Sequence, residues 1–275
     1  LALLALGGCK PVTLPADATP QAARQITTQA DTTGVLDGPL TVVERDVEFL
    51  SQGQRVVGTL ALPEGGDGPY PVVLIFHGFT NDRNALPIQG TDENLYGRSA
   101  RLLAEHGIAS LRIDFRGSGQ SEGEWSDTMF SGQIDDALAA VDFLATVPGV
   151  DAARLGLIGL SQGGRVAAET AAREPEVDSV ALWSAVANPP DTYQLLMGAG
   201  TVAQGLAAPD PGVEVTLPWG DPFLMKRGFF EDLYAVNPIG AISQVEAPLL
   251  VVVGLQDTTV MPQPYQGETF LNYHE

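Results

Sequence analysis

The chain has 275 residues, enough for one α/β domain, and its 44% hydrophobic and 17% charged residues are typical of a globular protein rather than a disordered one. Acidic residues number 34 against 14 basic ones, and the resulting net charge of −20 repels phosphate backbones, which argues against a nucleic-acid partner. The single cysteine excludes an internal disulfide and a thiolate metal site.

The N-terminal residues are predicted to be an export signal followed by a tether. An apolar run too short to span a bilayer ends in LGGC at residues 6–9, which resembles the lipobox of bacterial lipoproteins. We therefore expect residues 1–9 to be the remnant of a lipoprotein-type signal peptide, with Cys9 as a lipid anchor and as the one contact with a membrane. The alternative is a plain secretory signal in which Cys9 is incidental. Residues 10–38, rich in Thr, Ala, Gln, Asp and Pro, predict a flexible tether. The protein is then expected to be exported and held at the cell surface or in the periplasm.

Alternating strand-like and helix-like patterns in residues 39–275 predict an α/β fold with a doubly wound, mostly parallel sheet. Continuous apolar runs indicate buried strands, and the stretches between them indicate helices. In chain order we expect a hairpin of strands 42–50 and 55–62, strand 71–76, helix 94–106, strand 108–113, helix 132–146, strand 154–160, helix 163–173, strand 177–183, buried strand 248–253 and helix 263–275, with Phe270, Leu271 and Tyr273 partly buried.

Residues 188–246 break this alternation with a proline-rich stretch that also holds Trp219, Phe223, Phe229 and Phe230. Insertions that follow strand ends in an α/β sheet lie where ligands bind, so we interpret the stretch as a cap over a site. The alternative is a long crossover whose aromatic residues serve ordinary packing.

Residues 159–163, GLSQG, fit the G-x-S-x-G pattern of a nucleophile elbow. An apolar strand precedes Ser161 and a helix of small residues follows it. The glycines allow a sharp turn that exposes the serine Oγ, and the helix N-terminus favours an oxyanion. The alternative is a glycine-rich structural turn.

Four motifs in matching order and spacing resemble those of the α/β-hydrolases, and in particular bacterial esterases such as the cinnamoyl and feruloyl esterases. They are HGFTN at 77–81, DFRGSGQS at 114–121, the elbow at 159–163, and GLQD at 254–257 with Val260 and Pro262. The resemblance covers about residues 42–262. It implies hydrolysis of a small-molecule ester without a metal or organic cofactor. It also implies that Ser161 is the nucleophile, that Asp257 is the acid, and that the backbone N–H groups of Phe79 and Gln162 bind the oxyanion.

The position of Asp257 agrees with that role, because it follows a buried strand and so belongs on the same side of the sheet as Ser161. Asp114 also follows a strand and is the rival acid. Its neighbours Arg116 and Gly117 favour a structural turn with a salt bridge instead.

A base must take the proton of Ser161, and the chain has only three histidines. His77 precedes the oxyanion loop and is expected to brace it, while His106 ends a helix and is expected to cap it. His274 follows Asp257, but a helix rising about 1.5 Å per residue would carry it roughly 15 Å away. In the resembling family another strand and a histidine-bearing turn follow this helix, so we expect the last strand and the catalytic histidine to lie beyond Glu275.

Three other activities remain as alternatives to ester hydrolysis at this stage. One is a serine peptidase of the prolyl-oligopeptidase type, and another is thioester hydrolysis or acyl transfer. The third is a non-catalytic binding protein on a hydrolase scaffold. If the aromatic residues of 188–246 line the site, they suit an apolar or aromatic acyl group.

Overall fold

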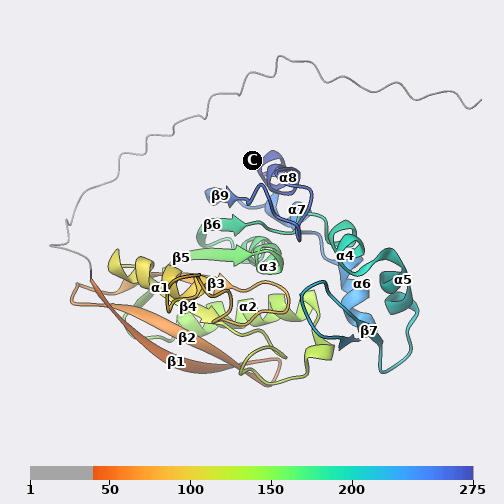
Figure 1. Cartoon of the computed structure of the whole chain (residues 1–275). Helices are drawn as coiled ribbons and strands as arrows, with labels where there is room; N and C mark the ends of the chain where they lie inside the picture. The colour runs from red at the N-terminus through yellow and green to blue at the C-terminus, as the bar shows by residue number, and fades with distance from the viewer. Residues whose placement is uncertain (1–39, 275) are drawn as a thin grey trace, which may run out of the picture. The chain divides into compact units, whose positions relative to one another are not determined.

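A computed structural model describes residues 40–274, whose centre is a mostly parallel sheet (Figure 1). Cys9, the predicted signal remnant and the tether lie outside the described residues. In spatial order the strands are β1 (Thr41–Ser51), β2 (Gln54–Glu64), β4 (Ala109–Ile113), β3 (Tyr70–Phe76), β5 (Val150–Leu160), β6 (Val177–Trp183) and β9 (Leu249–Val252). The pairs β1–β2 and β2–β4 are antiparallel, and every pair from β4 to β9 is parallel.

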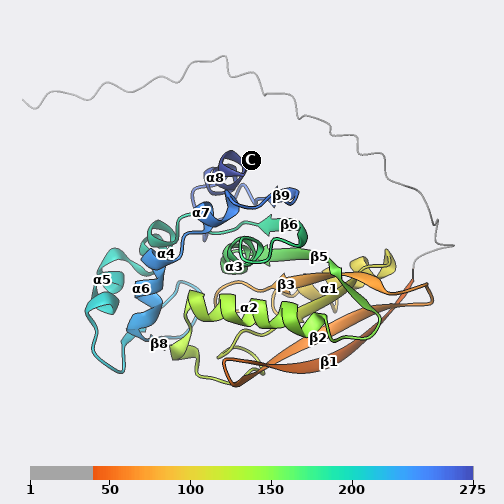
Figure 2. The same cartoon turned by 180° about the vertical axis from the view of Figure 1, so that it is seen from behind.

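Helices cover both faces of this sheet, as expected for a doubly wound fold. Helix α1 (Leu95–Glu105) lies on one face, and α2 (Phe130–Leu144) and α3 (Gln162–Ala171) lie on the other (Figures 1 and 2). The side chain of Asn94 caps α1 by accepting from the N–H of Gly97. Every residue of α3 is buried, because its glycines and alanines allow close packing on the strands.

All the strands and helices expected from sequence are present, with bounds shifted by a few residues. The prediction was wrong about burial at the C-terminal end of the sheet. Strand β9 is the last strand of the described range and lies at an edge of the sheet. Its Val251 faces α8, whereas Leu250 and Val252, on the other face, are 57% and 48% exposed. On α8 (Tyr265–Tyr273), Phe270 is buried as expected, but Leu271 and Tyr273 are exposed.

Residues 188–246 form four helices and a small separate sheet. Their elements are α4 (Pro189–Met197), α5 (Ala199–Ala207), β7 (Val213–Val215), β8 (Phe223–Met225), α6 (Arg227–Ala235) and α7 (Pro238–Ile242). A second apolar cluster fills this region, and Phe79 and Phe130 from the main layer join it. The oxyanion loop therefore packs directly against the core of this insertion.

Candidate active site

Several strands deliver chemistry-bearing residues to one pocket where they end. Ser161 follows β5, Ser184 follows β6, and Asp257 lies in the turn after β9. Together with Phe79 and Trp219 they line a cavity of about 370 Å³. The C-terminal ends of parallel strands are where α/β folds bind ligands, and the predicted nucleophile and acid meet there.

Ser161 occupies a strained turn between β5 and α3. Its φ of 53° and ψ of −115° are unusual for a residue with a side chain. The turn is fixed by hydrogen bonds from the N–H of Ser161 to the carbonyl of Trp183 (2.8 Å) and from the N–H of Val186 to the carbonyl of Ser161 (3.2 Å). Such local strain, held by its surroundings, is what a nucleophile elbow requires.

The glycines beside Ser161 are required by close backbone approaches. A Cβ added to Gly159 would lie 2.1 Å from the carbonyl oxygen of Gly163, and one added to Gly163 would lie 2.3 Å from that of Phe76. The start of α3 therefore sits against the end of β3. This brings the helix N-terminus to the loop that carries Gly78 and Phe79.

The predicted oxyanion donors are available in this geometry. Among residues 40–274, no protein acceptor takes a hydrogen bond from the backbone N–H of Phe79 or of Gln162. The ring of Phe79 is held by Trp125, Tyr193, Phe223 and Phe229, with ring centroids 5.4 to 6.0 Å apart. The loop position is thus set by aromatic packing, while its N–H stays free.

His77 braces this loop from below, as predicted. It is 2% exposed, and its Nδ1 lies 2.8 Å from the carbonyl oxygen of Gly78 while its Nε2 accepts from the N–H of Phe115 (3.3 Å). Burial lowers the pKa of His77, and the pattern of one donated and one accepted hydrogen bond fits a neutral ring. Because both nitrogens are engaged, His77 cannot serve Ser161 as a base.

The other two histidines lie away from the pocket, also as predicted. The Nδ1 of His106 hydrogen-bonds to the carbonyl of Leu102 (2.8 Å) at the exposed end of α1. The Nε2 of His274 hydrogen-bonds to the carbonyl of Ala247 (2.9 Å), just before β9 begins. His274 therefore lies near the start of the parallel strands, whereas Ser161 lies where they end.

Asp257 presents one free carboxylate oxygen at the pocket. Its Oδ1 accepts from the N–H groups of Thr259 (2.8 Å) and Val260 (3.1 Å). Its Oδ2 accepts no hydrogen bond from the described part of the chain. A carboxylate fixed at one oxygen and open at the other is suited to orient an imidazole.

Asp114, the rival acid, is fully committed to structure. It is completely buried, forms an ion pair with Arg83, and accepts from the N–H groups of Arg83 (2.7 Å) and Gln120 (2.8 Å). The predicted salt bridge exists, but the partner was wrong, because Arg116 instead pairs with Asp136 at 2.5 Å. Arg83 is 31 residues from Asp114 in the chain, and no local pattern marks the pair.

The aromatic residues of 188–246 divide into two groups. Trp219 is half-exposed in the pocket, with its Nε1 3.5 Å from the Oγ1 of Thr80, and Phe223 lines an adjoining hollow. Phe229 and Phe230 are fully buried in the second core, so for these two residues the alternative of ordinary packing is the correct one.

Three buried side chains near the elbow were missed from sequence. Gln133, Arg165 and Tyr193 are each at most 3% exposed and surround Gln162 and the start of α3. Arg165 carried a signal, because it and Glu169 are the two charged residues in a helix that otherwise consists mostly of small residues. Gln133 and Tyr193 carried none.

Two observations on the described residues concern metal-binding clusters and membrane-spanning helices. No group of three or more His, Cys, Asp or Glu side chains in residues 40–274 could hold a metal ion. No helix in the same range combines the length and apolar character that crossing a bilayer requires.

The sheet, the elbow and the acid turn define an α/β-hydrolase, as the motifs predicted. Est1E from Butyrivibrio proteoclasticus, solved with ferulic acid bound, has a similar fold with a TM-score of 0.68 and 22% identity, covering 83% of this chain and 85% of that one. The profile of the X-Pro dipeptidyl-peptidase (S15) family matches residues 52–210, more than half of the chain. The chain belongs to this family.

Curated relatives match over shorter stretches. The uncharacterized 31.7 kDa protein in the traX-finO intergenic region of Escherichia coli is 29% identical over 131 residues, which cover 48% of this chain and 42% of that protein. Esterase FrsA of Serratia proteamaculans is 33% identical over 133 residues, which cover 48% of this chain and 29% of the esterase. The matched region thus spans less than half of these relatives. Fold and family together place the chain among the α/β-hydrolases.

Proposed function

We propose that the protein hydrolyses carboxylic esters through an acyl-enzyme on Ser161. The observation that carries this proposal is the strained backbone of Ser161 at the N-terminus of α3, with two unengaged N–H groups beside the same pocket. The esterases among the similar proteins support the choice of substrate. A half-exposed Trp219 and an apolar rim suit an acyl group with apolar or aromatic character.

The reaction follows from these positions. The Ser161 Oγ attacks the ester carbonyl carbon while its proton passes to a base, and the carbonyl oxygen becomes an oxyanion that accepts from the N–H groups of Phe79 and Gln162. The C–O bond to the alcohol then breaks, and the alcohol leaves with the proton. Water attacks the acyl-enzyme by the same route and releases the acid.

We further propose that the base is a histidine outside residues 1–275. All three histidines of the chain are engaged elsewhere, while the Oδ2 of Asp257 is open and the outer edge of β9 is unpaired within the described range. Translating the gene past Glu275 tests this. A further strand followed by a histidine supports the proposal, and a stop codon directly after Glu275 contradicts it.

Peptide hydrolysis is the second candidate, and the family match is what favours it. An S15-type activity would release a dipeptide whose second residue is proline. The same serine would serve both reactions, so labelling it does not distinguish them. Parallel assays with p-nitrophenyl esters and with an X-Pro p-nitroanilide do.

Labelling with a fluorophosphonate probe tests the nucleophile. We expect the wild type, expressed from its whole gene, to gain one covalent adduct on the peptide that contains Ser161, since a strained and activated serine reacts where other serines do not. Ser161→Ala should remain unlabelled. The exposed Ser243, replaced by alanine, gives the matched control and should label like the wild type. Equal labelling of the wild type and Ser161→Ala would contradict Ser161 as the nucleophile and favour a non-catalytic binding protein.

A further inference from the structure

The side chain of Gln162 is held at both ends by residues from two other helices. Its Oε1 accepts from the hydroxyl of Tyr193 on α4, and its Nε2 donates to the Oε1 of Gln133 on α2 at 2.6 Å. All three side chains are at most 3% exposed. The residue proposed to donate its backbone N–H to the oxyanion is therefore fixed through its own carboxamide.

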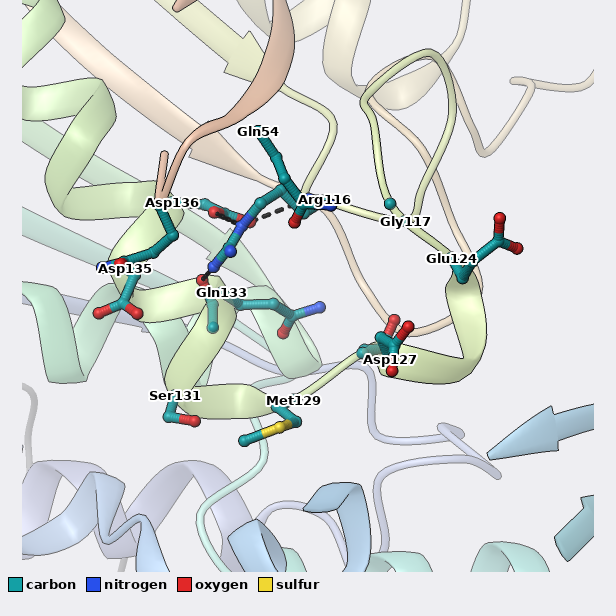
Figure 3. A pocket seen from close by; sticks show the side chains of 14 residues that line it. Gln54, Arg116, Gly117, Glu124, Asp127, Met129, Ser131, Gln133, Asp135 and Asp136 are labelled. Carbon is teal, nitrogen blue, oxygen red and sulfur yellow. Dashed lines mark hydrogen bonds and ion pairs between the residues drawn. The ribbon is translucent and has the colours of Figure 1, made fainter. Parts of the chain in front are cut away.

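Gln133 anchors this chain of hydrogen bonds at the wall of a second cavity. That cavity measures about 370 Å³ and lies between the β1–β2 turn, the loop after β4 and the start of α2 (Figure 3). Gln133 lines it, and Arg116 and Asp136, paired with each other, flank the same wall. The carboxamide of Gln133 thus separates a polar cavity from the elbow.

Arg165 lies one helical turn after Ser161 and carries a charge without a counter-ion. It is 0% exposed, and its three guanidinium nitrogens have no hydrogen-bond partner among the described residues. Its Cζ stands 3.3 Å from the ring centroid of Phe130, a cation–π contact. Burial lowers the pKa of Arg165 to about 9.

Two carboxylates lie near enough to influence Arg165, but neither forms an ion pair with it. Glu169 pairs through its Oε2 with Arg173 at 2.6 Å, while its buried Oε1 has no hydrogen-bond partner among the described residues. Asp232 accepts from the N–H and hydroxyl of Ser131 at 2.8 and 2.7 Å. Packing alone does not account for a guanidinium at this position, because an apolar side chain of similar length would avoid the cost of burying an unpaired charge.

The charge of Arg165 acts on Tyr193 instead. Burial raises the pKa of Tyr193, and the nearby guanidinium opposes that rise. The hydroxyl of Tyr193 therefore stays protonated and donates to the Oε1 of Gln162, with the guanidinium charge close behind it. The same positive charge, in a dry interior one turn from Ser161, also favours negative charge on the substrate oxygen.

We propose that Arg165, Tyr193 and Gln133 are positioning residues of the oxyanion hole, which hold Gln162 so that its backbone N–H points at the developing oxyanion. This proposal rests on ester hydrolysis at Ser161. It assigns to α4 a role in the chemistry, because Tyr193 reaches from that helix to the back of the elbow.

Replacing Arg165 with methionine tests the proposal in the protein expressed from its whole gene. We expect kcat to fall about tenfold with KM changed less than about twofold, because the lost effect operates in the transition state. We also expect Tm to rise or stay constant, because the unpaired buried charge is removed. Arg173→Met, just beyond the C-terminal end of α3 and 46% exposed at its side chain, is the matched control and should leave kcat unchanged.

Tyr193→Phe gives a second and milder variant, since it removes only the hydroxyl. We expect a fall in kcat of about fivefold to tenfold, and an equal loss of affinity for a trifluoromethyl ketone, whose serine adduct carries an oxyanion. Full kcat in both Arg165→Met and Tyr193→Phe, with an active wild type, overturns the positioning proposal alone. If the wild type itself shows no Ser161-dependent turnover, the proposed function is overturned as well.

Discussion

Gly163→Ala is expected to disable the elbow. The new Cβ would lie 2.3 Å from the carbonyl oxygen of Phe76 and 2.5 Å from that of His77, so either α3 or the oxyanion loop must move. Overpacking of this kind costs about 3 kcal/mol of unfolding free energy. A displacement of about 1 Å at the reacting groups lowers kcat by about 100-fold. Urea unfolding and ester turnover measure the two effects.

Gly200→Ala is the control for that substitution. Gly200 lies in α5, and a Cβ added there meets nothing within 4 Å. Alanine is the better helix former by up to about 1 kcal/mol, so this variant should be as stable as the wild type or more so, with unchanged turnover. Loss of activity in Gly200→Ala, or full activity in Gly163→Ala, would contradict the steric account of the elbow.

The regular part of the fold could be predicted from sequence because its signals are local. The run PVVLIF marks β3, Asn94 and Gly107 bracket α1, and the small residues after Ser161 mark α3. Residues 188–246 could not be predicted in this way, since proline and aromatic residues there follow neither a helical nor a strand period. The exposure of Leu250 and Val252 was missed because an apolar run does not reveal which face of its strand is covered.

The candidate site also has one part that local motifs predict and another part that they do not. Ser161, Asp257 and the Phe79 loop belong to short motifs, so the sequence alone predicts them. The network behind them connects α2, α3 and α4 through contacts such as that of Tyr193 with Gln162, 31 residues apart. Nothing in one sequence signals pairings of this kind, which arise only when the helices pack.

The burial of Phe229 and Phe230 also changes what the insertion is expected to do. These residues, with Tyr193, pack around the loop of Phe79 and the ring of Phe130. The insertion therefore supports the oxyanion loop and the elbow from behind. Trp219 is the member of the predicted aromatic set that faces the pocket.

Asp257→Asn is expected to lower kcat with little effect on stability, whereas Asp114→Asn is expected to lower stability with little effect on kcat. Asparagine at 257 can still accept from the N–H groups of Thr259 and Val260, so the change in unfolding free energy should stay within about 1 kcal/mol. It cannot stabilise a protonated imidazole, and kcat should fall by about 10⁴-fold. Turnover of a p-nitrophenyl ester and urea unfolding of the same samples provide both numbers.

Asparagine at 114 leaves the guanidinium of Arg83, 4% exposed, without its buried counter-ion. Breaking such a pair costs about 3 to 5 kcal/mol, so Asp114→Asn should lose much of its stability. The fraction that stays folded should keep its kcat, because Asp114 faces Arg83 and Gln120 rather than the pocket. If Asp114→Asn were instead stable and inactive, while Asp257→Asn kept full turnover, the acid of the triad would be Asp114 and the role given to the turn after β9 would be wrong.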